Sequence, residues 1–168
     1  MKLFSFILII CVSSNCFSQD LEKSIAGIIN DYINKNHSDS NLKIVSLNSG
    51  SVLASQSCTN KRSGTIDSER GELKCGQLQI NYDIGFMAGT HVASVNKNTF
   101  NWYAEELVDG NKIYIGLKKE NSIWKLVITI LSDTDVRSDP ANFWAEVENT
   151  VEARQVIATA FSYKKKIN

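Results

Sequence analysis

Apolar residues recur at steps of three and four after residue 20, which predicts an amphipathic helix from about Asp20 to Lys35. Asp20 is a suitable N-cap, because its charge favours a helix N-terminus. We expect the apolar stripe to pack on a sheet, since its polar face mixes acids and bases and is not that of a membrane-surface helix. The stripe contains Leu21, Ile25, Ile28, Ile29, Tyr32 and Ile33.

Between residues 42 and 131 the pattern changes to that of strands. Segments 42–47 and 51–55 flank a turn signal at residues 48–50. The segment 78–84 alternates strictly, so it is predicted to have one apolar face and one wet face that carries Asp83.

A hairpin is predicted around Asp109-Gly110, which suits a two-residue primed turn. This turn pairs Val108 with Asn111, and counting outwards places Trp102 opposite Leu117. The apolar residues of both arms then share one face. A second turn leads into the segment 123–131, which has apolar residues on both faces and is expected to be a central strand.

A C-terminal helical region is predicted to open at Asp139-Pro140, because proline is tolerated in a first helical turn. Phe143, Val147 and Val151 then step by four, and a break is expected near residues 149–150. Lys164 to Lys166 are expected just past the helix end, where cations are favourable.

These elements predict an α+β domain with an N-terminal amphipathic helix, an antiparallel β-meander of about six strands, and a C-terminal helix packed on the sheet. One compact domain is expected over residues 19–168.

Residues 1–18 have the order of charge, apolar run and small residues that is typical of a cleavable signal peptide. Lys2 precedes the apolar segment Leu3 to Val12, and a cut before Gln19 places Cys16 and Ser18 at small-residue positions. The apolar run is shorter than the roughly 20 residues of a membrane-spanning helix. We expect an exported protein, periplasmic or secreted, with no transmembrane segment after cleavage. A lipid anchor on Cys16 and a buried N-terminal strand are the alternatives.

Cleavage would remove Cys11 and Cys16, leaving Cys58 and Cys75. A remaining pair in an oxidising compartment is most simply a disulfide, which would be worth about 3 kcal/mol for this loop length. A zinc site is disfavoured, because the chain has neither a CxxC nor a paired-histidine motif.

Lysine plus arginine and aspartate plus glutamate number 18 each, so charge does not favour nucleic acid as a partner. No motif predicts a metal, a cofactor or a catalytic residue. His37 and His91 are the two histidines, and Asp83, Glu105 and Glu106 are the carboxylates that an acid–base pair could use. Glu105 and Glu106 are neighbours on a strand and should point to opposite faces.

Trp102, Trp124, Trp144 and the tyrosines could line an apolar pocket, although filling the core is their more common use. The leading hypothesis is therefore a non-enzymatic exported module that binds a protein or an apolar small ligand through one side of its sheet. The alternative is a small secreted hydrolase whose site assembles only in the fold.

Overall fold

The computed structural model of the 168-residue chain describes residues 13–34, 41–64, 68–85, 88, 97–132 and 140–166. The predictions made for Lys2, Leu3 to Val12, His37 and His91 lie outside these residues.

Within the described ranges the chain is an α+β protein with two α-helices and ten strands. The helical elements are α1 (Ser13–Asn34), α2 (Thr150–Phe161) and the short 3-10 helix η1 (Lys97–Thr99). The strands are β1 (Leu42–Ser46), β2 (Gly50–Ser55), β3 (Thr59–Arg62), β4 (Glu69–Cys75), β5 (Leu78–Ile84), β6 (Trp102–Val108), β7 (Asn111–Glu120), β8 (Ile123–Ser132), β9 (Ala141–Val147) and β10 (Lys164–Lys165). Neither helix of the described chain is both long and apolar enough to cross a membrane.

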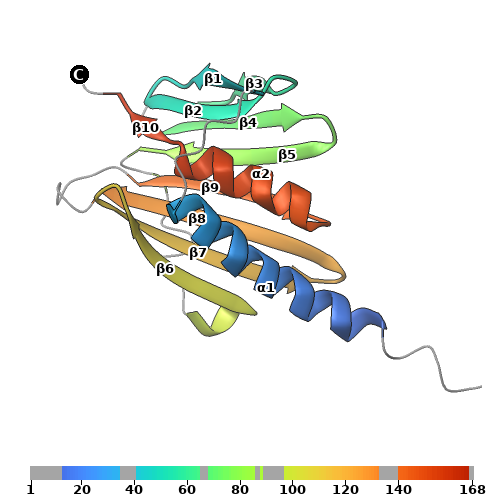
Figure 1. Cartoon of the computed structure of the whole chain (residues 1–168). Helices are drawn as coiled ribbons and strands as arrows, with labels where there is room; N and C mark the ends of the chain where they lie inside the picture. The colour runs from blue at the N-terminus through green and yellow to red at the C-terminus, as the bar shows by residue number, and fades with distance from the viewer. Residues whose placement is uncertain are drawn as a thin grey trace, which may run out of the picture.

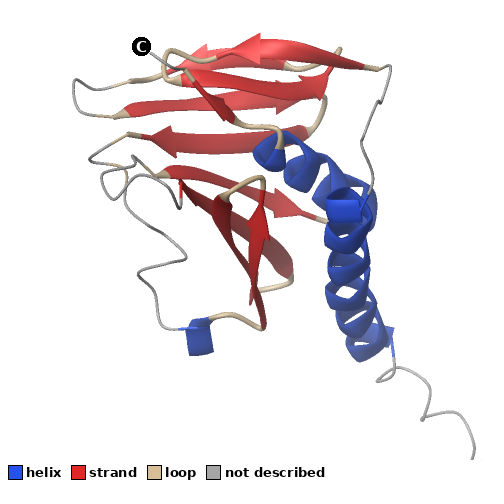
Figure 2. Cartoon of the chain, turned by 60° about the vertical axis from the view of Figure 1, so that its left-hand side comes forward, coloured by secondary structure: helices blue, strands red, loops and turns tan. Residues whose placement is uncertain are grey.

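Seven strands form one antiparallel sheet in the order β3-β4-β5-β9-β8-β7-β6, and β1, β2 and β10 form a smaller one (Figure 1). Helix α2 packs on β2, β8 and β9, and α1 packs on α2. Both long helices lie on one side of the large sheet (Figure 2). We call that side the inner face and the opposite side the outer face.

The inner face holds the core, because every strand from β5 to β9 turns its alternate residues towards the helices. In β5 the inward residues are Leu78, Ile80, Tyr82 and Ile84, all of which are buried. In α2 the buried side chains are Ala153, Val156, Ile157, Thr159 and Ala160. The strict period of two thus produces one continuous apolar layer beneath α2.

Several local predictions are confirmed. Strand β5 has the predicted bounds, and the β6–β7 hairpin has the predicted register, with Val108 opposite Asn111 and Trp102 opposite Leu117. Asp109 and Gly110 both have positive φ, at 50° and 75°, as a primed turn requires. Strand β8 has neighbours on both sides, as a central strand should.

The predicted meander of about six strands matches the structure only roughly, because the strand order is not sequential throughout. Strand β9 inserts between β5 and β8, so β5 and β6 are not neighbours, and β6 lies at the far edge of the sheet. Strands β6, β7, β8 and β9 pair in the order of the sequence, and β9 also pairs with β5.

The helix predicted from Asp139-Pro140 is wrong over residues 141–147, which form β9. Phe143 and Val147 are four residues apart, a spacing that fits a helix but is also an even step in a strand. Their strand neighbours Ala141 and Ala145 complete the buried row. Val151, which the helical pattern included, is 75% exposed.

Helix α2 instead begins after the predicted break. The Asn149 side chain accepts a hydrogen bond from the Glu152 main-chain N–H, which makes it the N-cap. Lys164 and Lys165 do not cap this helix, because they pair with β2 as strand β10. Helix α1 was only roughly predicted, since it begins at Ser13 and not at Asp20.

The two sheets are joined through Glu69, a buried carboxylate on the inner face of β4. Its oxygens accept hydrogen bonds from the main-chain N–H groups of Asn48 and Ser49, each at 2.8 Å, and from the Ser49 hydroxyl. The Arg62 side chain adds bonds to the Ser46 carbonyl and the Asn48 side chain. These contacts fix the β1–β2 turn against the edge of the large sheet.

Candidate functional site

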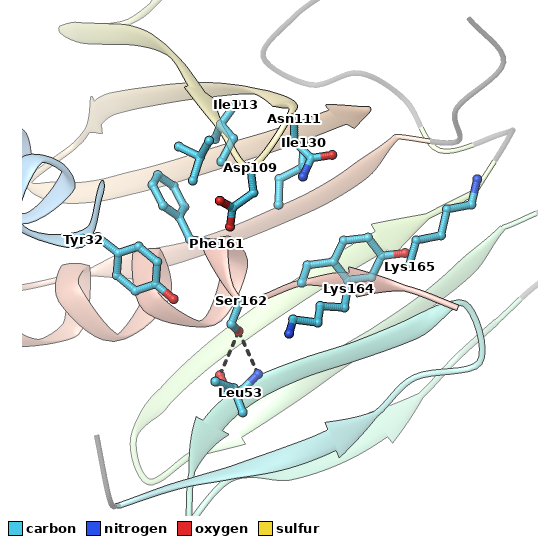
Figure 3. A pocket seen from close by; sticks show the side chains of 12 residues that line it. Tyr32, Leu53, Asp109, Asn111, Ile113, Ile130, Phe161, Ser162, Lys164 and Lys165 are labelled. Carbon is cyan, nitrogen blue, oxygen red and sulfur yellow. Dashed lines mark hydrogen bonds between the residues drawn. The ribbon is translucent and has the colours of Figure 1, made fainter. Parts of the chain in front are cut away.

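A cavity of about 350 Å³ lies where the C-terminal ends of α1 and α2 meet the β6–β7 turn (Figure 3). Its apolar lining comes from Phe161 of α2, Leu53 of β2, Val108 of β6, Ile113 of β7 and Ile130 of β8. The cavity sits between the helices and the inner face, so the space there is not completely filled by side chains. A volume of this size is at the lower end of small-molecule pockets.

Two aromatic rings form one wall of the cavity. The Tyr32 and Phe161 rings meet edge to face, with centroids 5.2 Å apart. The Tyr32 hydroxyl donates a long hydrogen bond, 3.5 Å, to the Ala158 carbonyl. Burial raises the pKa of Tyr32, and the nearby Asp109 carboxylate raises it further. Tyr32 therefore lines the cavity as a neutral phenol.

Ser162 closes the cavity on the side of β2. Its hydroxyl accepts a hydrogen bond from the Leu53 N–H at 2.7 Å, and the Thr159 carbonyl lies 2.7 Å away as an acceptor for its proton. Figure 3 shows the contacts with Leu53. Because these main-chain groups occupy the hydroxyl, Ser162 serves as a structural wall that connects α2 to β2.

Charged residues stand at the rim. In Figure 3 the Asp109 carboxylate points from the β6–β7 turn into the cavity, and Lys164 reaches towards Ser162. Lys165 extends away from the cavity in the same view, and Asn111 adds an amide. The site thus combines an apolar floor with one anion and one cation at its mouth, which suits a small molecule with an apolar body and a polar end.

The predicted disulfide between Cys58 and Cys75 is present, and both cysteines are buried. It joins the residues next to the Thr59–Lys74 pair, so it fastens β3 to β4 at the edge of the large sheet. The Gln155 amide of α2 lies 3.7 Å from the Cys58 Sγ, so the bridge also lies beneath this helix.

The three carboxylates considered for acid–base chemistry do not converge. Asp83 and Glu105 lie on the outer face of β5 and β6, with three strands between them, which is about 19 Å at the usual strand spacing. Glu106 lies opposite Ile113 and faces inwards. Both histidines are outside the described residues, so the structure does not place them relative to these acids.

The prediction that Asp83 lies on a wet face of its strand is wrong. Asp83 lies on the predicted outer face but is only 3% exposed, so this part of that face is not wet. One carboxylate oxygen pairs with the Arg70 Nε at 3.1 Å, while the other has no hydrogen-bond partner among the residues that the structure describes. Beside it, the buried Thr129 hydroxyl donates to the Asn142 side chain at 2.7 Å.

The tryptophans have three different environments. Trp124 is a core residue, Trp102 is half-buried against the core, and Trp144 is half-buried on the outer face. None of them lines the cavity of Figure 3, whose aromatic residues are Tyr32, Phe161 and Tyr163. The sequence pattern predicted that Tyr32 would be an apolar-face residue, but it contained no sign that the end of its helix would meet the β6–β7 turn.

Comparison with known proteins does not identify the chain: no family model matches it, and no curated protein is similar to it. Within the part of the chain that the structure describes, no group of three or more histidine, cysteine, aspartate or glutamate side chains could hold a metal ion. Any account of function therefore rests on the geometry above.

Proposed function

We propose that this protein is a non-enzymatic, exported binding module that takes a small apolar ligand into the cavity between its helices and its sheet. The observation that carries the proposal is the unfilled volume of about 350 Å³ bounded by Phe161, Ile113 and Ile130. The apolar side chains around it present apolar surface to the opening, and a ligand that covers this surface removes it from water.

The polar rim narrows the choice of ligand. A purely aliphatic molecule would leave the Asp109 and Lys164 heads in water at the mouth, whereas a molecule with one polar end can bond to either. The apolar floor accounts for affinity through buried area, and the rim accounts for orientation. We therefore favour an apolar ligand that carries one polar end over a purely aliphatic one.

Export is supported by the signal-like N-terminus and by the Cys58–Cys75 disulfide, since disulfides persist in oxidising compartments. A cut before Gln19 would pass through α1 as drawn in Figure 1. It would keep the buried α1 residues Leu21, Ile25, Ile28 and Ile29 in the mature chain. The mature protein would thus retain the helix face that packs on α2.

The cavity can be tested with an apolar fluorescent probe, anilinonaphthalene sulfonate, and with decanol as a competitor. Val108→Trp places a large side chain into the cavity. It should weaken the binding of both the probe and decanol by about tenfold or more. Leu107→Trp is the matched control, because the neighbouring residue is 63% exposed and points to the other face. Circular dichroism and thermal melting would verify that both variants fold.

Equal binding by Val108→Trp and the unmodified chain, or no binding by either, would overturn this proposal. Export has its own measurement, which is the mass and N-terminal sequence of the protein recovered from its native cell. We expect the chain to start at Gln19, and recovery of a chain that still begins with residues 1–18 would contradict cleavage.

A further inference from the structure

A second concave site lies on the outer face, on the opposite side of the sheet from the cavity. It consists of two hollows of about 400 and 430 Å³ that share Trp144 and Lys125. The first hollow contains Phe100 and Val127, and the second extends past Asn81. Because the hollows share two lining residues, they lie side by side, and together they extend over β5, β9, β8 and β7. We call this pair of hollows the outer groove.

The aromatic ring at one end of the groove is held in place by the sheet beneath it. Phe100 lies directly over Gly116, where an added Cβ would be 2.4 Å from the ring. The next residue, Asn101, donates its N–H to the Leu117 carbonyl and accepts a hydrogen bond from the Lys119 N–H at 2.8 Å. The absence of a side chain at Gly116 therefore creates the space for Phe100. The hydrogen bonds of Asn101 hold the neighbouring main chain, and with it the ring, against β7.

The floor between the two rings is continuous. Gly116, Val127 and Trp144 are cross-strand partners in β7, β8 and β9, and Asn81 of β5 pairs with Trp144. Aromatic and apolar groups thus follow one row across the sheet and end at an amide. Trp144 is partly buried and lines both hollows, so part of its side chain faces the groove.

Polar groups border this row. Gln79 donates a hydrogen bond to the Asn81 side-chain oxygen at 3.0 Å. This bond uses the oxygen of the Asn81 amide and not its N–H donors. Lys125 and Glu146 face each other in register, but no ion pair joins them in the described chain. The groove therefore offers an amide, an ammonium and a carboxylate next to an indole.

This combination disfavours two ligand classes. An apolar ligand would bury the Lys125 and Asn81 polar groups without partners, which is costly. A polyanion would meet the carboxylates Glu146, Glu148 and Glu152 in the second hollow. Lys118 does not offset them, because it pairs with Glu120 at 2.8 Å.

We propose that the outer groove binds a neutral oligosaccharide, with one sugar ring stacked on Trp144 and the neighbouring rings extending towards Phe100 and Gln79. A pyranose ring has a face of C–H groups that carry a small positive charge, which complements the negative face of an indole. Its hydroxyl edge both donates and accepts, so it can bond to the Asn81 amide, the Lys125 ammonium and the Glu146 carboxylate at once.

The experiment titrates the folded protein with cellohexaose, maltohexaose and chitohexaose, following tryptophan fluorescence and the heat of binding. We expect at least one of these sugars to bind, and Trp144→Ala to weaken that binding by about tenfold or more, the scale of losing one stacked ring. Asn81→Ala should weaken it less. Leu107→Ala is the control, because Leu107 lies on the same face outside the groove.

No binding of any of the three sugars, or binding that Trp144→Ala leaves unchanged, would overturn the proposal. Stronger binding of dextran sulfate than of every neutral sugar would overturn it as well. Anilinonaphthalene sulfonate should bind Trp144→Ala as it binds the unmodified chain, since the cavity lies on the other face. The two binding proposals can therefore fail separately.

Discussion

The two faces of the large sheet differ in burial and in composition. Two adjacent residues of β9 show the difference. Phe143 faces inwards, is fully buried, and contacts the rings of Tyr82 and Tyr163. Trp144, the next residue, faces outwards and is half-buried between Val127 and Asn81. The inner face is a packed apolar layer, whereas the outer face mixes aromatic and polar groups. Stability should therefore depend mainly on the inner face.

The sharpest test of this contrast is a pair of substitutions at neighbouring positions. Phe143→Ala should lower the free energy of unfolding by about 4 kcal/mol, because it removes a fully buried ring from the core. Trp144→Ala removes a larger side chain but should cost less than half as much, since the residue is half-buried. Urea denaturation followed by circular dichroism measures both. Equal losses would show that the two faces are equally packed.

Removal of the Cys58–Cys75 disulfide tests how the β3 edge of the large sheet is held in place. Strand β3 has no buried residue, so apolar burial within this strand does little to hold it against β4. We expect the double variant Cys58→Ser, Cys75→Ser to lose about 3 kcal/mol, through greater entropy of the unfolded chain. Denaturation of the protein with and without reductant should give a similar difference. A loss below about 1 kcal/mol would mean that strand pairing alone secures this edge.

Glu69 is the polar exception on the inner face. In Glu69→Gln one carboxylate oxygen becomes an NH₂ group that must face a main-chain N–H or the Ser49 hydroxyl. The loss of charge-assisted bonds should cost about 2 kcal/mol. The matched control is Glu72→Gln on the outer face of the same strand. Its ion pair with the 81%-exposed Lys61 side chain should be worth less than about 1 kcal/mol.

If Glu69→Gln and Glu72→Gln destabilise the protein equally in thermal melts, the junction between the two sheets does not depend on Glu69. We expect Glu69→Gln to destabilise the protein clearly more than Glu72→Gln does. We also expect faster hydrogen exchange at the Asn48 and Ser49 amides in Glu69→Gln. Those two amides report directly on the β1–β2 turn that the carboxylate holds.

Sequence patterns predicted the inner face better than the outer one, for a physical reason. Alternation of apolar residues reports burial in a shared core, and it placed β5 and the β6–β7 hairpin correctly. It did not identify β9, because small inward residues such as Ala141 and Ala145 contribute little to an apolar pattern. With β9 assigned to a helix, the strand order could not be derived.

The candidate sites were less predictable still. The cavity of Figure 3 joins residues from two helices, five strands and the segments next to them, and no local pattern encodes their meeting. The outer groove depends on Gly116 lying beneath Phe100, a contact between residues on different elements. Asp83 was expected to be wet, since alternation says which face a residue occupies but not whether that face is covered.

Tyr103 and Glu105 allow the assignment of faces itself to be tested. Partial burial, together with a hydrogen bond donated to the Glu105 carboxylate, raises the pKa of Tyr103 from 10.0 to about 12. The Lys97 ammonium, which bonds to the same carboxylate, is the main cause that lowers the pKa of Glu105. Because the folded-state pKa of Tyr103 exceeds that of the unfolded chain, its contribution to stability is complete below pH 10 and lost as pH rises through about 12.

The titration of Tyr103 can be measured from phenolate absorption against pH, while circular dichroism confirms that the protein stays folded. Subtracting the titration of Tyr103→Phe from that of the unmodified chain isolates the signal of Tyr103. Glu105→Gln should lower the Tyr103 pKa, because it removes the charge that opposes the phenolate. Glu106→Gln should leave it unchanged, since Glu106 lies opposite Ile113 on the inner face. A similar pKa change in both variants would contradict the face assignment of β6, and with it the separation of cavity and outer groove.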